Sequence, residues 1–288
     1  MLYLVGIGLW MKQITLEALE ALKESDIIYL DSYTSLSTDI NTETLSQTIG
    51  KQVIQASRSM LEFPGVKKVI TEAQSKNISI AVVGDPLAAT THSIILEEAS
   101  TRKIPFKVIH GVSGVHISML ESLLQVYKFG RIITLVYPLK DIYPYSTLSY
   151  LYANMCLGLH TLLLLDLKLD EGKLMKAHEA ASILMEMEER KWGKTLLGKV
   201  LAIVLEASGT PRQKITIELL EDVGSEKFNT IPQSIIIPGK LHFEEEELLQ
   251  KIYEVEEGIL RTHQETLKSK LDTMCKRANI CNGDGGIE

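Results

Sequence analysis

The chain has 288 residues, 45% hydrophobic and 23% charged, which is ordinary for a globular protein of one large or two smaller domains. Its formal net charge of −7 argues against a partner held mainly by phosphate neutralisation, so we expect no nucleic-acid partner. No apolar run reaches the roughly 18 residues of a membrane span, and the first residues resemble a strand, so the sequence predicts a cytoplasmic protein with neither membrane segment nor signal peptide.

The cysteines and histidines do not follow metal-site or disulfide patterns. Cys156, Cys275 and Cys281 form no closely spaced pair. An odd count without C-x-x-C spacing argues against a disulfide framework and against a thiolate zinc site. The H-E-x-x-H pattern is also missing, because Ser182 stands where a second histidine would follow His178. We therefore expect reduced thiols and no metal.

In chain order, the first half alternates short apolar runs with helical patterns. Strands are predicted at residues 2–5, 26–30, 52–54, 80–83 and 106–109. Helices are predicted at residues 15–24, 42–49 and 66–75, with a further helix capped by Thr90 or Thr91. Strands that alternate with helices predict a parallel sheet built from right-handed crossovers.

Three of these strands end in loops suited to a ligand site. Residues 6–9 contain a Gly-x-Gly pair, Asp85 stands between a glycine and a proline after a buried strand, and residues 110–114 are small and precede a helix over 115–124. Ligands of open α/β sheets bind outside the carboxyl ends of the strands. A dinucleotide fingerprint is incomplete because Met11 replaces the third glycine, and plain turns remain the alternative for these loops.

The second half predicts another sheet with its own helices. Strands are expected at residues 132–136, 161–165, 200–205 and 234–237, and helices at 146–157 and 171–191. A helical stripe runs onward from residue 244, interrupted by Gly258, and four glutamates at its start suit a helix N-terminus. We therefore predict an α/β domain over residues 1–112, a second over 113–263, and a helical or disordered tail over 264–288, whose last residues, 282–286, are expected to be disordered.

The opening L-Y-L-V-G-I-G-L resembles the first loop of the tetrapyrrole methylase superfamily, which uses S-adenosylmethionine. Five further stretches resemble the diphthine synthase family within it: Y-T-S-L at 33–36, G-D-P-L-A-A-T-T-H at 84–92, Y-K-F-G at 127–130, G-L-H-T-L-L at 158–163 and P-G-K-L-H at 238–242. The resemblance covers roughly residues 1–243. It implies a two-domain tetrapyrrole-methylase-like α/β fold, a homodimer and an S-adenosyl-L-methionine-dependent N-methyltransferase. The implied substrate is the 3-amino-3-carboxypropyl-histidine of translation elongation factor 2, whose methylated amino group gives diphthine in diphthamide biosynthesis.

The same resemblance implies the residues that contact the cofactor. By matching position they are Leu9, Asp85, Ala88, Ser113, Gly114, Leu165, Ser208 and Gln233. Gly114 stands where a larger apolar residue is usual and Gln233 where histidine is common, so contacts there are expected through the backbone. Methyl transfer to an amine depends chiefly on alignment, and the sequence singles out no catalytic base among Tyr33, His110 and Tyr137.

Two alternatives stay open. A methyltransferase of the same superfamily could act on a tetrapyrrole or on ribosomal RNA, although the acidic net charge and the stretches above count against both. A protein of another class, a non-catalytic cofactor-binding scaffold, would also keep the pocket. A methyl-transfer assay on candidate substrates separates these readings.

Overall fold

The computed structural model describes residues 1–140 and 142–278, and the chain forms two compact units. Unit 1 comprises Met1–Ile117, Leu167–Lys173 and Ala207–Arg212, and unit 2 comprises Ser118–Asp166, Leu174–Glu206 and the described residues from Gln213 onward. Both units contain helices and a five-stranded sheet, which confirms the predicted α/β class. Within the described ranges, no helix is long and apolar enough to cross a membrane. The predicted disorder of residues 282–286 lies outside them.

The sheet of unit 1 is parallel throughout, as predicted. Its strands are β1 (Leu2–Gly6), β2 (Ile27–Asp31), β3 (Val53–Ala56), β4 (Ile78–Val82) and β5 (Phe106–Ile109), in the order β3-β2-β4-β1-β5. Strand β1 lies between β4 and β5, so the loops that follow β4 and β5 lie on either side of its end. All five residues of β4 are buried, as expected for a strand covered on both faces.

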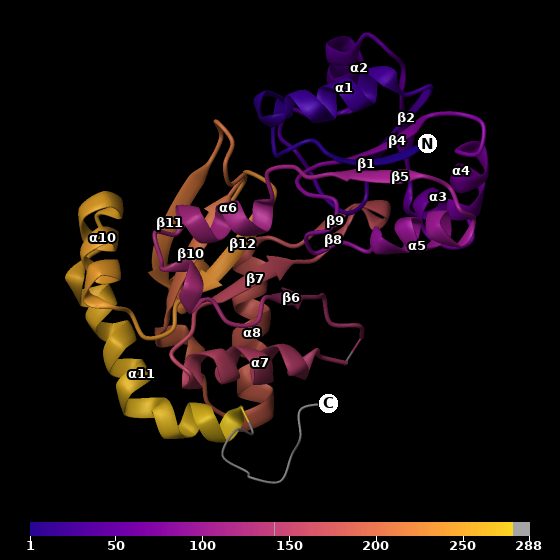
Figure 1. The fold of residues 1–288 in the computed structure, drawn as a ribbon. Helices are drawn as coiled ribbons and strands as arrows, with labels where there is room; N and C mark the ends of the chain where they lie inside the picture. Colours follow the sequence, from indigo (N-terminus) through magenta and orange to yellow (C-terminus); the bar gives the residue numbers. More distant parts are fainter. Residues whose placement is uncertain (141, 279–288) are drawn as a thin grey trace. The chain divides into compact units, whose positions relative to one another are not determined.

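Helices cover both faces of this sheet (Figure 1). On one face lie α1 (Leu16–Glu24) and α2 (Thr42–Ile49), and on the other α3 (Arg58–Leu61), α4 (Val66–Glu72) and α5 (Ser93–Thr101). The side chain of Thr15 caps α1 by accepting a hydrogen bond from the backbone N–H of Ala18. Two apolar layers, one on each face, hold the sheet and so fix the positions of the loops at its carboxyl edge.

The sheet of unit 2 is mixed. Its strands are β6 (Ile133–Leu135), β7 (Thr161–Leu165), β10 (Leu201–Glu206), β11 (Lys214–Leu219) and β12 (Gln233–Ile237), in the order β11-β10-β12-β7-β6. Only β6 and β7 are parallel neighbours. Strand β11 was not predicted from the sequence. It lies at the edge of the sheet and buries only Leu219 of its six residues, so its pattern lacks the apolar run of an inner strand.

From residue 114 onward the α-helices are α6 (Gly114–Glu121), α7 (Tyr145–Cys156), α8 (Ala177–Trp192), α9 (Leu220–Val223), α10 (Phe243–Tyr253) and α11 (Glu257–Arg277).

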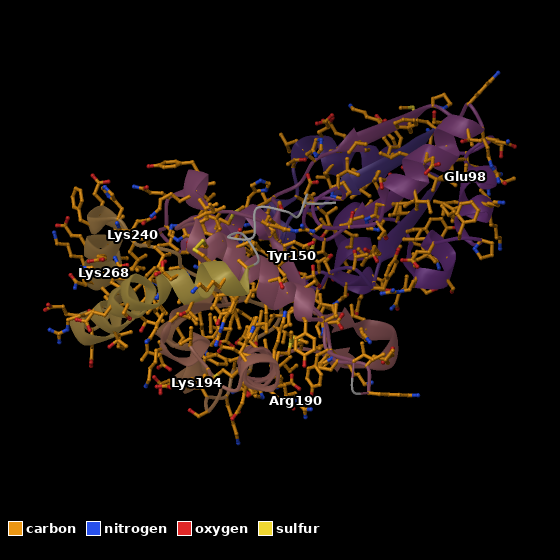
Figure 2. The ribbon with its side chains drawn as sticks, turned by 90° about the horizontal axis from the view of Figure 1, so that it is seen from below. Glu98, Tyr150, Arg190, Lys194, Lys240 and Lys268 are labelled. Carbon is orange, nitrogen blue, oxygen red and sulfur yellow. A yellow bond between two sulfur atoms is a disulfide. The ribbon has the colours of Figure 1, made fainter. Side chains whose placement is uncertain are left out.

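The predicted helix over residues 171–191 was wrong at its start. Residues 167–174 form two short paired strands, β8 (Leu167–Lys168) and β9 (Lys173–Leu174), with Gly172 in the left-handed region between them. Helix α8 ends before Gly193, and Arg190 (labelled in Figure 2) lies in its last turn, where a positive charge suits the helix dipole.

The helical segment near the C-terminus is interrupted at a different residue from the one expected from the sequence. Glu254, with a φ of 54°, ends α10, whereas Gly258 is the second residue of α11. The first turn of a helix has N–H groups without intrahelical partners in any case, so a glycine is tolerated there. Helix α11 continues unbroken past residue 263 and buries Leu267 and Met274 in the core of unit 2. The segment therefore packs on its own unit.

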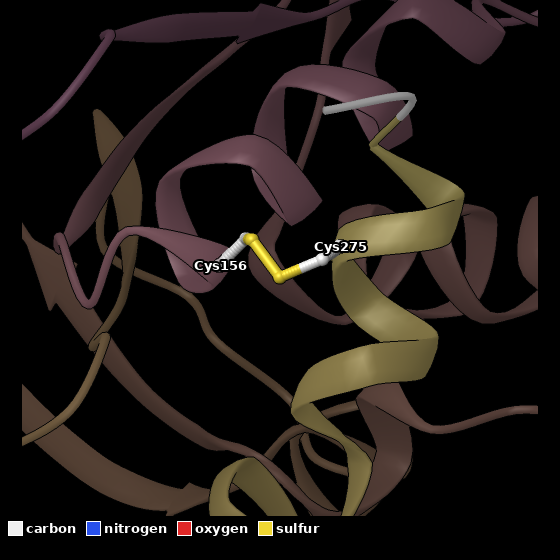
Figure 3. Close-up of a disulfide and its surroundings, with 2 residues drawn as sticks. All are labelled: Cys156 and Cys275. Atoms are coloured by element: carbon white, nitrogen blue, oxygen red, sulfur yellow. A yellow bond between two sulfur atoms is a disulfide. The ribbon is translucent and has the colours of Figure 1, made fainter. Parts of the chain in front are cut away.

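A disulfide joins two helices of unit 2 that are far apart in the sequence (Figure 3). Cys156 at the end of α7 is bonded to Cys275 in α11, 119 residues away, with the two Cα atoms 5.1 Å apart. The expectation of reduced thiols without a disulfide was wrong. It rested on spacing along the sequence, whereas the bond depends on α7 and α11 lying side by side in the folded chain.

His263 on α11 is fully buried and makes two hydrogen bonds. Its Nδ1 accepts from the backbone N–H of Leu201 at 3.0 Å, so Nε2 carries the proton and donates to the Gly239 carbonyl at 3.2 Å. Burial lowers the pKa of the imidazole to about 4, an effect that the Gly239 carbonyl only partly offsets. The neutral ring is therefore the form that the fold accepts.

This histidine is expected to destabilise the protein in mild acid. Because its pKa is lower in the folded than in the unfolded chain, the unfolded state binds the proton first as the pH falls from about 6.5 to about 4. Stability attributable to His263 is complete above that window, and roughly 3 kcal/mol is lost across it. The free energy of unfolding, measured with urea at several pH values, should fall less toward acid pH for His263→Gln than for the exposed-site control His242→Gln. Equal slopes for both variants would contradict the assignment.

Candidate functional site

Three glycines let the loops at the carboxyl edge of the first sheet close over the end of β1. A Cβ on Gly6 would lie 2.5 Å from the Gly111 nitrogen and 2.8 Å from the Gly84 carbonyl oxygen, and a Cβ on Gly111 would lie 2.3 Å from that same oxygen. Gly84 also has a φ of 87°, which favours glycine. We call Gly6, Gly84 and Gly111 the glycine seam. It holds the loop after β4 against the loop after β5.

A pocket of about 570 Å³ lies beside the glycine seam, within unit 1. Its lining residues are Asp85, Leu87, Ala88, His110, Gly111, Val112, Ser113, His116 and Ile117. Ser113 is only 8% exposed, and its hydroxyl has no hydrogen-bond partner within the described part of the chain. A buried hydroxyl without a partner costs free energy, so its position in this wall suits a polar ligand atom.

Asp85 organises the two loops that line this pocket. One carboxylate oxygen accepts the Leu87 N–H at 3.0 Å, and the other accepts His110 Nδ1 at 2.8 Å and the Gly111 N–H at 3.3 Å. Partial burial raises the pKa of the Asp85 carboxyl, but the hydrogen bonds from Leu87, His110 and Gly111 outweigh it, and the pKa lies below its usual value. The side chain is therefore a carboxylate that ties both loops together.

Further predicted contact residues lie close to this pocket in unit 1. Leu9 follows β1, and its side chain lies against two glycines. A Cβ added to Gly114 would be 3.4 Å from the Leu9 side chain, and a Cβ added to Gly209 would be 3.1 Å from it. The Gln13 side chain bridges the same segments, accepting from Leu9 N–H at 2.9 Å and donating to the Gly209 carbonyl at 2.8 Å. Leu9, Gly114 and the segment that contains Ser208 are thus brought together, as are Asp85, Ala88 and Ser113.

The remaining two predicted contacts belong to unit 2. Leu165 is the buried last residue of β7 and pairs with Leu135 of β6. Gln233 is the first residue of β12, and both ends of its amide are occupied: Oε1 accepts the Ala177 N–H at 2.8 Å, and Nε2 donates to the Thr230 carbonyl at 2.9 Å. The side chain of Gln233 therefore serves the start of α8, and the residue pairs with Glu206 of β10 in the sheet.

The three residues left open as proton acceptors differ sharply in environment. Burial and then the Asp31 charge raise the pKa of the Tyr33 phenol to about 12, and burial and then Glu179 raise that of Tyr137 to about 12. Both phenols stay protonated at neutral pH and so cannot accept a proton there. Of the three, His110 lines the pocket, and its side chain is 70% exposed.

Several lining residues of the pocket were not predicted from the sequence. His116 and Ile117 follow Ser113 at helical spacing on α6, so the three share one face of the chain as the helix begins. That spacing was visible in the sequence, but its direction depends on where the helix starts. The structure begins α6 at Gly114, which turns His116 and Ile117 to the pocket.

These features define an α/β protein with a ligand-sized pocket at the carboxyl edge of a parallel sheet. Comparison with known proteins gives the family of this α/β protein. The profile of the family Tetrapyrrole (Corrin/Porphyrin) Methylases matches residues 1–224. The chain belongs to this family and is a methyltransferase.

Individual proteins with similar sequences or structures match most of the chain. The chain is 40% identical over 265 residues to a diphthine synthase of Staphylothermus marinus, covering 91% of this chain and 97% of the relative. It is 39% identical over 246 residues to a diphthine synthase of Metallosphaera sedula, covering 85% and 96%. A crystal structure of a diphthine synthase superposes with a TM-score of 0.80 at 29% identity, covering 91% of this chain and 99% of that one. These similarities support a methyltransferase role in diphthamide synthesis.

Proposed function

We propose that this protein uses S-adenosyl-L-methionine to methylate the amino group of the 3-amino-3-carboxypropyl chain on one histidine of translation elongation factor 2, giving diphthine. The observation that carries the proposal is the pocket at the glycine seam, which is lined by the Asp85 carboxylate and by a buried Ser113 hydroxyl that has no hydrogen-bond partner among the described residues. The similarity to named diphthine synthases along nearly the whole chain supports the choice of substrate.

The residues of the pocket suit this cofactor. A volume of about 570 Å³ falls within the range of about 300–1,000 Å³ typical of small-molecule sites. The Ser113 hydroxyl and the N–H groups that begin α6 offer hydrogen bonds to its polar and carboxylate groups. The residues that would contact it are Leu9, Asp85, Ala88, Ser113, Gly114, Leu165, Ser208 and Gln233. When bound, S-adenosylmethionine supplies an electrophilic methyl group on a positively charged sulfur.

The protein's contribution is chiefly to hold and orient. An amine lone pair must point along one line at the methyl carbon, and correct alignment of bound groups can supply a large part of a rate enhancement. The loops that carry Asp85 and Ser113 are fixed by the glycine seam and by three hydrogen bonds to one carboxylate. A rigid wall of this kind keeps the geometry of the pocket from one turnover to the next.

The proposal extends to assembly and location. We propose a homodimer, supported by three exposed apolar side chains of unit 2, Tyr127, Leu157 and Phe243, which are 81%, 64% and 67% exposed in the single chain. Sedimentation should give twice the 32.2 kDa mass of one chain. A cytoplasmic location follows from the substrate. The Cys156–Cys275 bond then implies a cell whose cytoplasm tolerates disulfides, as in hyperthermophilic archaea and bacteria.

The test uses purified protein, methyl-labelled cofactor and elongation factor 2 in two forms, with and without the aminocarboxypropyl group. We expect label only in the modified factor, on its amino nitrogen by mass spectrometry. Tetrapyrroles and ribosomal RNA are included as competing acceptors. Equal labelling of both factor forms, or labelling of a competing acceptor instead, would refute the assignment. Cofactor binding without any transfer would point to a non-catalytic scaffold.

A further inference from the structure

The pocket wall contains an aspartate–histidine pair of which only the aspartate is among the proposed cofactor contacts. Asp85 follows β4 and His110 follows β5, and the glycine seam brings them together across the end of β1. His110 Nδ1 lies 2.8 Å from the Asp85 carboxylate. The histidine side chain is 70% exposed and that of the aspartate 12%, so an exposed ring in the pocket lining is held by a largely buried carboxylate.

The geometry determines which ring nitrogen carries the proton. A carboxylate only accepts hydrogen bonds, so His110 Nδ1 must be the donor. In the neutral ring the lone pair then belongs to Nε2, the nitrogen turned away from Asp85. Two backbone donors, the N–H groups of Leu87 and Gly111, hold the carboxylate itself in place. The pair thus presents an oriented proton acceptor backed by a negative charge, which stabilises the imidazolium that forms on proton uptake.

An acceptor of this kind has a task in the proposed reaction. A primary amine with a pKa near 10 is mostly protonated in water, and only its neutral form has the lone pair that methyl transfer needs. Each methylation also leaves a product ammonium, which must lose a proton before the same nitrogen can react again. In this step the N–H bond breaks, its electron pair stays on the amine, Nε2 binds the proton, and the exposed imidazolium releases it to water.

We propose that His110 Nε2 is the proton acceptor for the substrate amine and that Asp85 is its positioning residue. This inference rests on the proposed function. Neither tyrosine considered above can take the role, because both phenols stay protonated at neutral pH. The other titratable group in the lining is His116 on α6, which makes it the natural control.

The first test needs neither cofactor nor substrate. Nitrogen-15 NMR of the cofactor-free protein should show neutral His110 with its proton on Nδ1. In Asp85→Ala, which removes the acceptor of the Nδ1 proton, the tautomer should shift toward Nε2 protonation. An Nε2-protonated ring in the unaltered protein would overturn the proposal, as would a tautomer unaffected by Asp85→Ala.

The second test is chemical rescue. His110→Ala should lower the single-turnover rate of methyl transfer by about 10²–10⁴-fold, the usual contribution of a general base. Cofactor affinity, measured by calorimetry, should change little. Added imidazole should then restore activity in a saturable manner. His116→Ala opens a hole of the same size in the same wall, and imidazole should not raise its rate.

The outcomes distinguish a failure of the proposed function from a failure of the role assigned to His110. If the unaltered protein transfers no methyl to the modified factor, the proposed function fails. If it does so and His110→Ala is fully active, only the assignment of His110 fails. A loss of cofactor affinity that matches the loss of rate would make His110 a binding contact instead, and equal rescue of both alanine variants would show that imidazole does not replace His110.

Discussion

Reduction of the Cys156–Cys275 disulfide should lower the free energy of unfolding by about 3–5 kcal/mol. The bond closes a loop of 119 residues, and a cross-link over so long a loop removes much of the conformational entropy of the unfolded chain. It also ties α11 to α7 within the core of unit 2. Equilibrium unfolding in guanidinium, with and without a phosphine reductant, measures the difference.

Serine variants locate the effect. Cys156→Ser and Cys275→Ser should each match the reduced protein, and the two together should cost no more than either alone, since either removes the same bond. Cys281→Ser, outside the described residues, should retain the stability and the response to reductant of the unaltered chain. We expect the reduced protein to stay folded, because Arg277 of α11 still pairs with the buried Glu188. A stability unaffected by reductant would contradict the pairing.

Removal of the Glu245 side chain should cost a similar amount. Glu245 is 1% exposed and accepts four hydrogen bonds in unit 2. One oxygen binds the Gln125 N–H at 2.9 Å and His160 Nε2 at 3.0 Å, and the other binds the His242 N–H at 2.7 Å and Lys128 Nζ. Burial raises the carboxyl's pKa, but these bonds outweigh it and hold the pKa at about 2.

Glu245→Ala leaves the hydrogen-bond donors of this carboxylate without their acceptor, above all the fully buried His160 and the Lys128 ammonium. Breaking a buried ion pair in this way typically costs about 3–5 kcal/mol. The matched control is Glu244→Ala, one residue earlier, where the carboxylate is exposed and the expected change is below about 1 kcal/mol. Thermal unfolding compares the two. Equal melting temperatures would mean that the network around Glu245 contributes little.

Much of the first sheet could be predicted because its strands are short apolar runs with clear boundaries. The predicted strand over residues 80–83 overlaps β4 (Ile78–Val82), and the loops after the strands lie at one edge as parallel topology requires. In contrast, β11 was missed because an edge strand mixes polar and apolar residues. The boundary between α10 and α11 was misplaced because Gly258 is a stronger signal in sequence than Glu254, the residue that adopts the left-handed conformation.

The pocket was predictable in outline but not in its contacts. Asp85 and the small residues after β5 could be expected at the carboxyl edge. That Asp85 and His110, 25 residues apart, form a hydrogen-bonded pair depends on β1 lying between β4 and β5. Strand order is a property of the whole sheet and leaves no local mark in the chain. The disulfide between α7 and α11 is invisible in sequence for the same reason.

The glycine seam also sets the limits within which this pocket can be redesigned. Any side chain at Gly6 or Gly111 would meet backbone atoms of the neighbouring loop, which cannot move aside as a flexible side chain can. A library intended to accept an altered cofactor should therefore leave the seam untouched. Variation belongs at Leu87, Val112 and Ile117, whose side chains line the pocket without holding the two loops together.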